Sequence, residues 1–237
     1  MSDCLNQIPE LLEKTGFSYL DAKAFYPAFT HSSYTFEHNM SQNMCYERLE
    51  FLGDAVLKLC VSKILFNRYP NFQEGKMTNI RAILVSDDFL FNLAEDINLK
   101  KYIRMAKSLY NSGGRDNPSI SACVFEAFLG TLFSLNVPIV KISDFLENMY
   151  DKYIKDINVF LPKFNSKALL QEYTQAKNND RPEYILKSTT GDESNLIFNV
   201  QVIYHNEVIG IGSGKTKKQA EREAAYQACL KWNINGD

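Results

Sequence analysis

The sequence predicts an all-α domain followed by a small α+β domain with the element order α-β-β-β-α. Two observations lead to this prediction. From Ile8 to about Tyr153, apolar residues recur at spacings of three and four, which is the period of an amphipathic helix. From Ser166 onward, a short helical stretch is followed by three strand-like runs and an alanine-rich helix. A chain of 237 residues can supply two such domains.

The first domain is expected to span residues 1–157. Its helices are indicated by apolar residues at helical spacing: Leu49, Leu52, Val56 and Leu59, then Ile80, Ile83 and Leu84, then Leu90 and Leu93. Prolines and glycines mark breaks between helices at 69–70, 112–114, 117–118 and 137–138. Ser119 is expected to cap a helix that runs to about Leu135.

The stretch 158–165, which contains Pro162, is expected to be a linker, and 166–235 to be the second domain. The predicted elements of that domain are a helix over 166–176, strands over 183–188, 196–204 and 208–212, and a helix over 217–232. His205-Asn206-Glu207 is expected to be a tight turn between the last two strands.

The bulk composition excludes several classes of protein. A content of 45% hydrophobic and 23% charged residues argues against global disorder. No run of about eighteen apolar residues occurs, so no membrane span is expected. The first residues lack the pattern of a secretory signal. The net charge of −2 gives no general sign of nucleic-acid binding, so that inference depends on local patterns.

The cysteines and histidines indicate a reduced, cytoplasmic compartment. The five cysteines are odd in number and include no Cys-x-x-Cys pair. The three histidines are not spaced for a zinc site. We therefore expect neither disulfides nor structural zinc, and no small-molecule cofactor is indicated.

Three acidic residues are expected on one stripe of a helix. Glu47, Glu50 and Asp54 stand at positions i, i+3 and i+7, which lie on the same side of an α-helix. Like charges at this spacing destabilise a helix, and apolar neighbours increase the penalty. A divalent cation would relieve it, although a solvated helix face would explain the same pattern.

Glu126 is a lone carboxylate in an otherwise apolar helical run. Buried glutamates are rare unless they are paired or bind a metal. If the two helices face each other, Glu126 converges with Glu50 and Asp54 into an all-oxygen site that suits Mg²⁺ or Mn²⁺. The alternative is that Glu126 pairs with an arginine such as Arg81 in the core.

Residues 47–54, Glu-Arg-Leu-Glu-Phe-Leu-Gly-Asp, resemble the signature of the ribonuclease III family at every position. The similarity continues through 30–34, 74–78, 81–85, 112–114 and 125–130, and it covers most of residues 5–155. The resemblance implies a metal-dependent endonuclease domain. It also implies a homodimer with one catalytic centre per subunit, which hydrolyses both strands of duplex RNA and leaves 5′-phosphate and 3′-hydroxyl ends.

The same resemblance assigns roles to individual residues. Glu50, Asp54 and Glu126 are implied metal ligands for Mg²⁺ or Mn²⁺, and Asp54 and Glu126 are implied catalytic residues. Glu47 and Glu74 are implied to line the same acidic valley. Structured precursors, such as those of rRNA, and mRNA are the implied substrates.

Cys123 departs from the family pattern. The family has an aspartate at this position, three residues before Glu126, as a further metal ligand. A thiol supplies no hard carboxylate oxygen, and Mg²⁺ binds sulfur poorly. Water or the remaining acids can fill the gap, Mn²⁺ can be preferred, or the chain can bind RNA without cutting it efficiently. The other ligand positions favour a working nuclease; a catalytically impaired duplex-RNA-binding protein is the alternative.

The C-terminal segments 168–175, 182–184 and 210–221 resemble a double-stranded-RNA-binding domain. Lys215, Lys217 and Lys218 stand at a glycine-rich turn into a helix N-terminus, where side-chain charge and the helix dipole both favour phosphate. Such domains read the shape of A-form RNA across its minor grooves. The residues of the first helix expected to face a minor groove are Gln171, Glu172 and Gln175.

The loop between the first two strands departs from that family. Its members usually carry a Gly-Pro-x-His-like motif for a minor-groove contact, whereas residues 191–194 are Gly-Asp-Glu-Ser. The two added negative charges are expected to weaken this contact.

Overall fold

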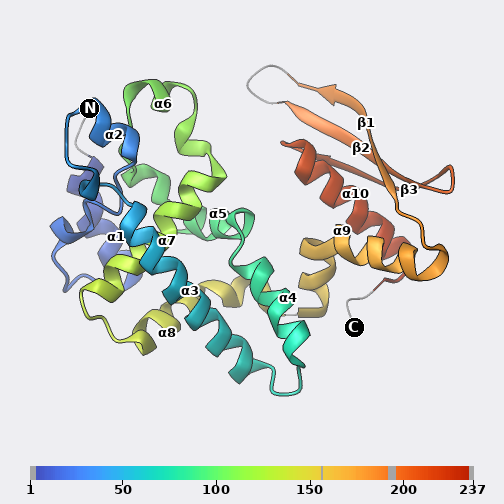
Figure 1. Cartoon of the computed structure of the whole chain (residues 1–237), viewed down its shortest axis with the longest axis horizontal. Helices are drawn as coiled ribbons and strands as arrows, with labels where there is room; N and C mark the ends of the chain where they lie inside the picture. Colours follow the sequence, from blue (N-terminus) through green and yellow to red (C-terminus); the bar gives the residue numbers. More distant parts are fainter. Residues whose placement is uncertain (1–3, 156, 192–195, 235–237) are drawn as a thin grey trace. The chain divides into compact units, whose positions relative to one another are not determined.

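The computed structural model describes residues 4–155, 157–191 and 196–234 (Figure 1). It divides into two compact units, Met1–Asp151 and Lys152–Asp237. The first unit is helical and the second combines helices with a sheet, which confirms the predicted fold class.

The first unit is built from helices alone. Its α-helices are α1 (Ile8–Thr15), α2 (Ser32–Glu37), α3 (Glu47–Arg68), α4 (Glu74–Leu84), α5 (Asp87–Asp96), α6 (Lys107–Asn111), α7 (Pro118–Ser134) and α8 (Ile139–Ile154). Short 3-10 helices lie between them: η1 (Cys4–Gln7), η2 (Ala22–Phe25), η3 (Gln42–Met44), η4 (Leu99–Tyr102) and η5 (Gly114–Asp116).

Helix α7 is the centre of this unit. Most of its residues are buried, which explains why its sequence is apolar on nearly every side. The rings of Phe25 and Phe29 both lie within 6.5 Å of Phe128, on the third turn of α7. Helices α3 and α5 pack along α7. Because α7 is largely enclosed, a charged side chain on it is expected to face a hollow or a partner.

The predicted cap of α7 is wrong by two positions. Asn117 is the cap, and its side chain accepts a hydrogen bond of 2.9 Å from the Ser119 N–H. Pro118 occupies the first helical turn, where a backbone N–H would have no partner within the helix, so the proline costs no hydrogen bond. The hydroxyl of Ser119 donates instead to Asp87 Oδ2 at 2.9 Å.

The second unit has the predicted order α-β-β-β-α. Its elements are α9 (Ile157–Asn178), β1 (Glu183–Thr190), β2 (Ile197–Tyr204), β3 (Glu207–Gly214) and α10 (Lys217–Lys231). The sheet is antiparallel in the order β1-β2-β3, with Tyr184 opposite Val202 and Val202 opposite Gly210. Buried residues of α9 and α10 share one core with the inward residues of β2 and β3, so both helices cover the same face (Figure 1).

Glycines in β3 explain how closely α10 packs on the sheet. A Cβ atom added to Gly212 would lie 2.2 Å from the backbone nitrogen of Ala224. The helix is therefore built of alanines where it crosses glycines, and neither side has room for a larger side chain.

The structure differs from the predicted linker. Residues 158–165 belong to α9, which begins at Ile157 and not near Ser166. A proline within a helix removes one backbone hydrogen bond but does not by itself require a break. Pro162 was therefore a poor marker of the boundary between the two units.

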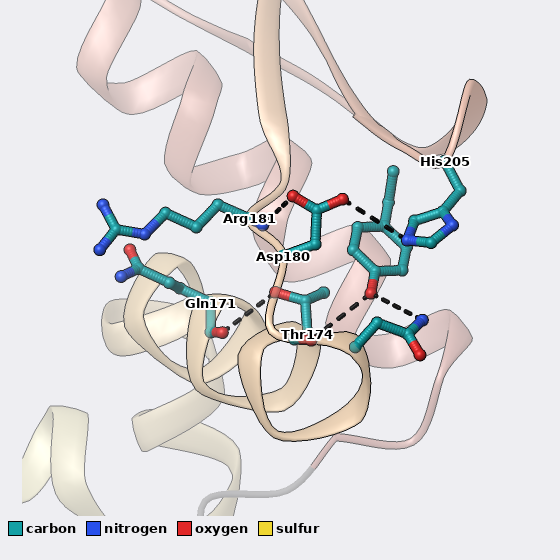
Figure 2. Close-up of polar contacts among 7 residues, drawn as sticks. Gln171, Thr174, Asp180, Arg181 and His205 are labelled. Atoms are coloured by element: carbon teal, nitrogen blue, oxygen red, sulfur yellow. Dashed lines mark hydrogen bonds and ion pairs between the residues drawn. The ribbon is translucent and has the colours of Figure 1, made fainter.

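Polar contacts fix the turn after α9 to the turn between β2 and β3 (Figure 2). Tyr204 OH donates to the carbonyl of Thr174 at 3.4 Å and accepts from Asn178 Nδ2 at 3.2 Å. Asp180 Oδ2 lies 3.5 Å from His205 Nε2. His205 and Asn206 adopt left-handed backbone angles, which confirms the tight turn expected here.

In the described part of the chain, no helix is both long enough and apolar enough to cross a membrane. All five cysteines have free thiols in the structure, as expected.

Candidate active site and RNA interface

The first turn of α3 is fixed by contacts around Thr30. The Thr30 carbonyl accepts from the N–H of Tyr46, the residue before α3, at 3.0 Å. The Thr30 hydroxyl accepts from Arg104 Nε at 2.6 Å and donates to the carbonyl of Tyr26 at 2.6 Å. These bonds hold the start of α3 in place, and with it the acidic residue Glu47.

Two glycines allow α3 and α7 to cross almost in backbone contact. A Cβ atom on Gly53 would lie 1.7 Å from the carbonyl oxygen of Glu126, and one on Gly130 would lie 2.0 Å from the carbonyl oxygen of Leu49. Such distances exclude any side chain at either position. The close crossing brings the acidic stripe of α3 beside Glu126 on α7.

The acidic residues line one hollow of about 610 Å³. Glu50 and Asp54 from α3 and Glu126 from α7 all line this hollow. Glu47 also lines the hollow. The remaining lining residues are Phe51, Lys58, Val85 and Asp87.

Asp87 is an acidic lining residue that sequence reasoning missed. It is the first residue of α5, where an aspartate is commonly found because it complements the helix dipole. The sequence signal is therefore that of an ordinary helix start. Only the packing of α5 on α7 places this carboxylate beside Glu126.

Burial raises the pKa of Glu126 to about 8, and the negative charges of Asp54, Glu50 and Asp87 add to this rise. Lys58 acts in the opposite direction. The hollow therefore has an electrostatic environment that favours a cation or a proton.

The alternative in which Glu126 pairs with Arg81 is not realised. Arg81 Nη1 donates to Ser62 Oγ at 2.9 Å. Between the described residues, no ion pair joins Arg81 to Glu126.

Cys123 lies half-buried on α7, close to Glu50. Burial raises the pKa of its thiol to about 12, and a hydrogen bond to Glu50 and the charges of Glu50, Glu126 and Asp87 contribute further. The thiol is therefore protonated at neutral pH and donates to the Glu50 carboxylate. The side chain at this position is therefore neutral, and it occupies part of the hydrogen-bonding capacity of Glu50.

The acidic side chains share a hollow without forming a ready chelate. Asp54 Oδ2 lies 2.7 Å from Lys58 Nζ, and Glu50 is engaged by Cys123. Within the described ranges, no three His, Cys, Asp or Glu side chains are placed to hold a metal ion together. The donors suit Mg²⁺ chemically because all are carboxylate oxygens. To bind the ion, Asp54 would first have to break its ion pair with Lys58.

Glu74 does not line this hollow within one chain, contrary to the expectation that it shares a valley with Glu47. It begins α4, and its Oε1 accepts from Thr78 Oγ1 at 2.8 Å. It lines a separate hollow of about 210 Å³ with residues of the second half of α3, among them Phe66. The physical reason is that α4 packs near the far end of the long α3 helix.

The predicted RNA-contacting lysines are exposed at the start of α10. Lys217 is its first residue, and Lys215 and Lys218 flank the helix start. The cap is Thr216, whose hydroxyl accepts from the Gln219 N–H at 3.2 Å, and the Gln219 side chain accepts from the Lys215 N–H at 3.1 Å. These bonds define the helix N-terminus at which a phosphate would meet the lysines.

The predicted minor-groove residues Gln171, Glu172 and Gln175 lie on α9, and Glu172 is exposed. Helix α9 packs on α10 through an ion pair of 2.7 Å between Lys167 and Glu221. The two expected RNA-contacting groups thus belong to adjacent helices of one unit. The acidic loop over 191–194 lies, apart from Gly191, outside the described residues.

A helical unit with a carboxylate-lined hollow, followed by an α-β-β-β-α unit with a lysine-rich helix start, defines a nuclease that binds duplex RNA. The sequence profile described as Ribonuclease-III-like matches residues 21–150, and that of the double-stranded RNA binding motif matches residues 166–231. The chain belongs to the ribonuclease III family.

Relatives cover both units. Ribonuclease 3 of Listeria welshimeri is 45% identical over 94% of this chain and 97% of its own length, and that of Bacillus cereus is 38% identical over 92% and 89%. The solved nuclease domain of ribonuclease III from Campylobacter jejuni has a TM-score of 0.55 and 30% identity, over 61% of this chain and 94% of that one. The protein is thus an endoribonuclease for double-stranded RNA, of a metal-dependent family.

Proposed function

We propose that the carboxylate-lined hollow is the catalytic centre and that Glu50, Asp54 and Glu126 hold a Mg²⁺ ion in it, with Asp54 and Glu126 as the catalytic residues. The observation that carries this proposal is that carboxylates from α3 and α7 line one hollow. Burial, together with the negative charges of Asp54 and Glu50, raises the pKa of Glu126. A divalent ion relieves that repulsion and displaces the proton. Mn²⁺ is the alternative ion.

The residues act by binding and orientation. A bound ion supplies polarisation of the scissile phosphate and lowers the pKa of an attacking water. Glu126 and Asp54 line the same hollow beside the α3–α7 crossing, so both can orient the water and the phosphate there. Glu47, exposed at the rim of the hollow, extends its acidic surface. The products are 5′-phosphate and 3′-hydroxyl ends.

We further propose that the protein works as a homodimer. Phe51, Leu59 and Phe66 form an apolar stripe on α3, and their side chains are 83%, 60% and 69% exposed in the single chain. Exposed apolar residues gathered on one helix face are typical of an interface. The solved nuclease domain from Campylobacter jejuni is described as having structural flexibility in a region involved in dimer formation. In such a dimer, Glu74 would join an acidic valley built from two subunits.

Residues 1–157 would then be the nuclease unit and 166–235 the unit that grips duplex RNA. Lys215, Lys217 and Lys218 contact phosphates. The minor-groove contacts come from Gln171, Glu172 and Gln175. We place the protein in the cytoplasm, where it would process structured RNA such as rRNA precursors and mRNA.

The RNA-binding assignment is tested by replacing Lys217 and Lys218 with alanine. Loss of two phosphate contacts should weaken duplex binding about tenfold or more for any sequence and lower the slope of log K against log salt by about two. The matched control replaces Lys177 and Lys231, exposed lysines elsewhere on α9 and α10. Equal affinity of the two double variants would contradict the assignment.

The catalytic assignment is tested by incubating labelled duplex RNA with the protein in Mg²⁺ and, separately, in Mn²⁺. Short products with 5′-phosphate ends are expected, and Asp54→Asn should abolish them while leaving duplex binding intact. A duplex that is bound but stays whole in both metals would contradict the proposal and indicate a protein that only binds RNA.

A further inference from the structure

The catalytic hollow has a single basic lining side chain in the described part of the chain, Lys58. Its ammonium lies 2.7 Å from Asp54 Oδ2, one helical turn away on α3. The same charge opposes the rise in the pKa of Glu126, so it acts on both sides of the hollow. Lys58 is therefore an electrostatic neighbour of two of the three proposed metal ligands.

The ion pair between Lys58 and Asp54 differs from an ordinary pair on a helix surface because it lines the acidic hollow. Exposed pairs at this spacing contribute little to stability. Here the partner, Asp54, is a proposed metal ligand, and the hollow also contains Glu47, Glu50, Asp87 and Glu126. An RNA phosphate approaching five carboxylates needs positive charge at the same place.

Cys123 reduces the positive charge that a metal can bring. The protonated thiol supplies no anionic ligand, and it engages the carboxylate of Glu50. Fewer anionic ligands hold fewer or more weakly bound divalent ions. A cation attached to the chain can make up part of that deficit.

We propose that Lys58 is a catalytic cation of this site: it holds Asp54 in the metal-free state and contacts a phosphoryl oxygen of the scissile phosphate once a metal takes Asp54. The inference rests on the proposed catalytic centre. The Lys58 side chain is 53% exposed, and its flexible stem can turn from the carboxylate to a phosphate bound beside it.

The chemical step leaves Lys58 unchanged. The oxygen of water forms a bond to phosphorus and gives up one proton to solvent. The bond from phosphorus to the 3′ oxygen breaks, and the leaving oxygen takes a proton from solvent. Negative charge grows on the phosphoryl oxygens as the step proceeds. The ammonium of Lys58 stabilises that charge and keeps its own protons.

The proposal predicts that Lys58→Met changes metal binding and catalysis in opposite directions. Without RNA, Mg²⁺ should bind about tenfold more tightly by titration calorimetry, because no ammonium competes for Asp54. At saturating Mg²⁺, single-turnover cleavage should slow by about 100-fold, because a charge that stabilises the transition state is lost. Lys58→Arg should keep most of the rate.

Lys63→Met is the matched control, since Lys63 is an exposed lysine of α3 outside the hollow. If Lys58→Met matches this control in Mg²⁺ affinity and rate, the proposal is overturned. Faster cleavage by Lys58→Met also overturns it, because Lys58 would then only obstruct the metal. Lys58→Gln, with the same readouts, replaces Lys58→Met if the latter unfolds. Failure of the unmodified protein to bind Mg²⁺ or to cut would instead refute the proposed catalytic centre.

Discussion

At the scale of single residues, the thiol of Cys123 and the carboxylate of Glu50 decide how the hollow can bind a metal. Cys123 is protonated and donates to Glu50, so a position that would hold an aspartate in the family is neutral here. If Glu50 is a metal ligand as proposed, the thiol and the ion would compete for the same carboxylate. Metal affinity would then limit the activity of the site.

Replacing Cys123 with aspartate should raise Mg²⁺-dependent cleavage. The change adds a hard oxygen ligand and releases Glu50, so we expect about a tenfold gain in rate at limiting Mg²⁺. The measurement is the cleavage rate as a function of Mg²⁺ concentration. The control is Cys123→Ser, which replaces the thiol at the same position without adding a carboxylate. An unchanged rate for Cys123→Asp would show that Cys123 does not occupy a limiting ligand position.

The raised pKa of Glu126 predicts how the stability of the metal-free protein depends on pH. Its pKa is about 8 in the folded chain and has an ordinary value of 4.5, so the folded state binds this proton more tightly than the unfolded state. The associated stability is present below about pH 4.5 and is lost as the pH rises to about 8.

Thermal melts in a chelating buffer measure this effect. The melting temperature of the native protein should fall between pH 5 and pH 8 by more than that of Glu126→Gln, which has no proton to lose there. Added Mg²⁺ should stabilise the native protein most at the upper end of that range. Parallel curves for the two proteins would contradict the origin assigned to the shift.

At the scale of secondary-structure elements, the crossing of α3 and α7 creates the site. The two helices approach so closely that, at Gly53 and Gly130, the backbone of the facing helix occupies the space that a side chain would need. With the larger separation between axes that is usual for packed helices, Glu126 would lie farther from Glu50 and Asp54. The glycines are therefore as necessary to the hollow as the acids that line it.

Gly53→Ala should separate α3 from α7. The added methyl group would lie 1.7 Å from a backbone oxygen, which no side-chain rotation can relieve. We expect a loss of about 3 kcal/mol in the free energy of unfolding and a large loss of cleavage. Denaturant unfolding measures the former. Gly75→Ala, on α4 with no atom within 4 Å of the added Cβ, is the control and should be neutral or slightly stabilising.

At the scale of the whole molecule, the nuclease domain and the double-stranded-RNA-binding domain are two units with separate cores. The first unit supplies the hollow, and the second supplies the lysine-rich start of α10. The apolar stripe of Phe51, Leu59 and Phe66 lies on the same helix as the acidic residues. Phe51 also lines the acidic hollow, so the proposed interface and the proposed catalytic centre lie side by side on α3. Leu59 belongs to the stripe and does not line the hollow, so a change at Leu59 should test assembly with the least effect on the acidic residues.

Leu59→Glu should therefore convert the dimer to a monomer. Leu59 does not line the acidic hollow, and a charge in an apolar interface is destabilising by several kcal/mol unless it is paired. Sedimentation velocity measures the change in mass, with Leu230→Glu on α10 as the control for an exposed leucine elsewhere. A native protein that is already monomeric, or a dimer unaffected by Leu59→Glu, would contradict the proposed interface.

The sequence by itself determined the elements of both units and the acidic stripe of Glu47, Glu50 and Asp54. Hydrophobic periodicity and residue spacing are local properties, so they are readable without the fold. The start of α9 escaped prediction, because a proline near a helix start signals a break only weakly.

Only the tertiary structure decided which groups meet. Helix packing brings Asp87 to Glu126, keeps Glu74 at a separate hollow and places Cys123 against Glu50. These pairings join residues distant in the chain, so no local pattern encodes them. The distances between charges, and therefore the pKa of Glu126 and the competition of Lys58 for Asp54, follow from the way the helices pack.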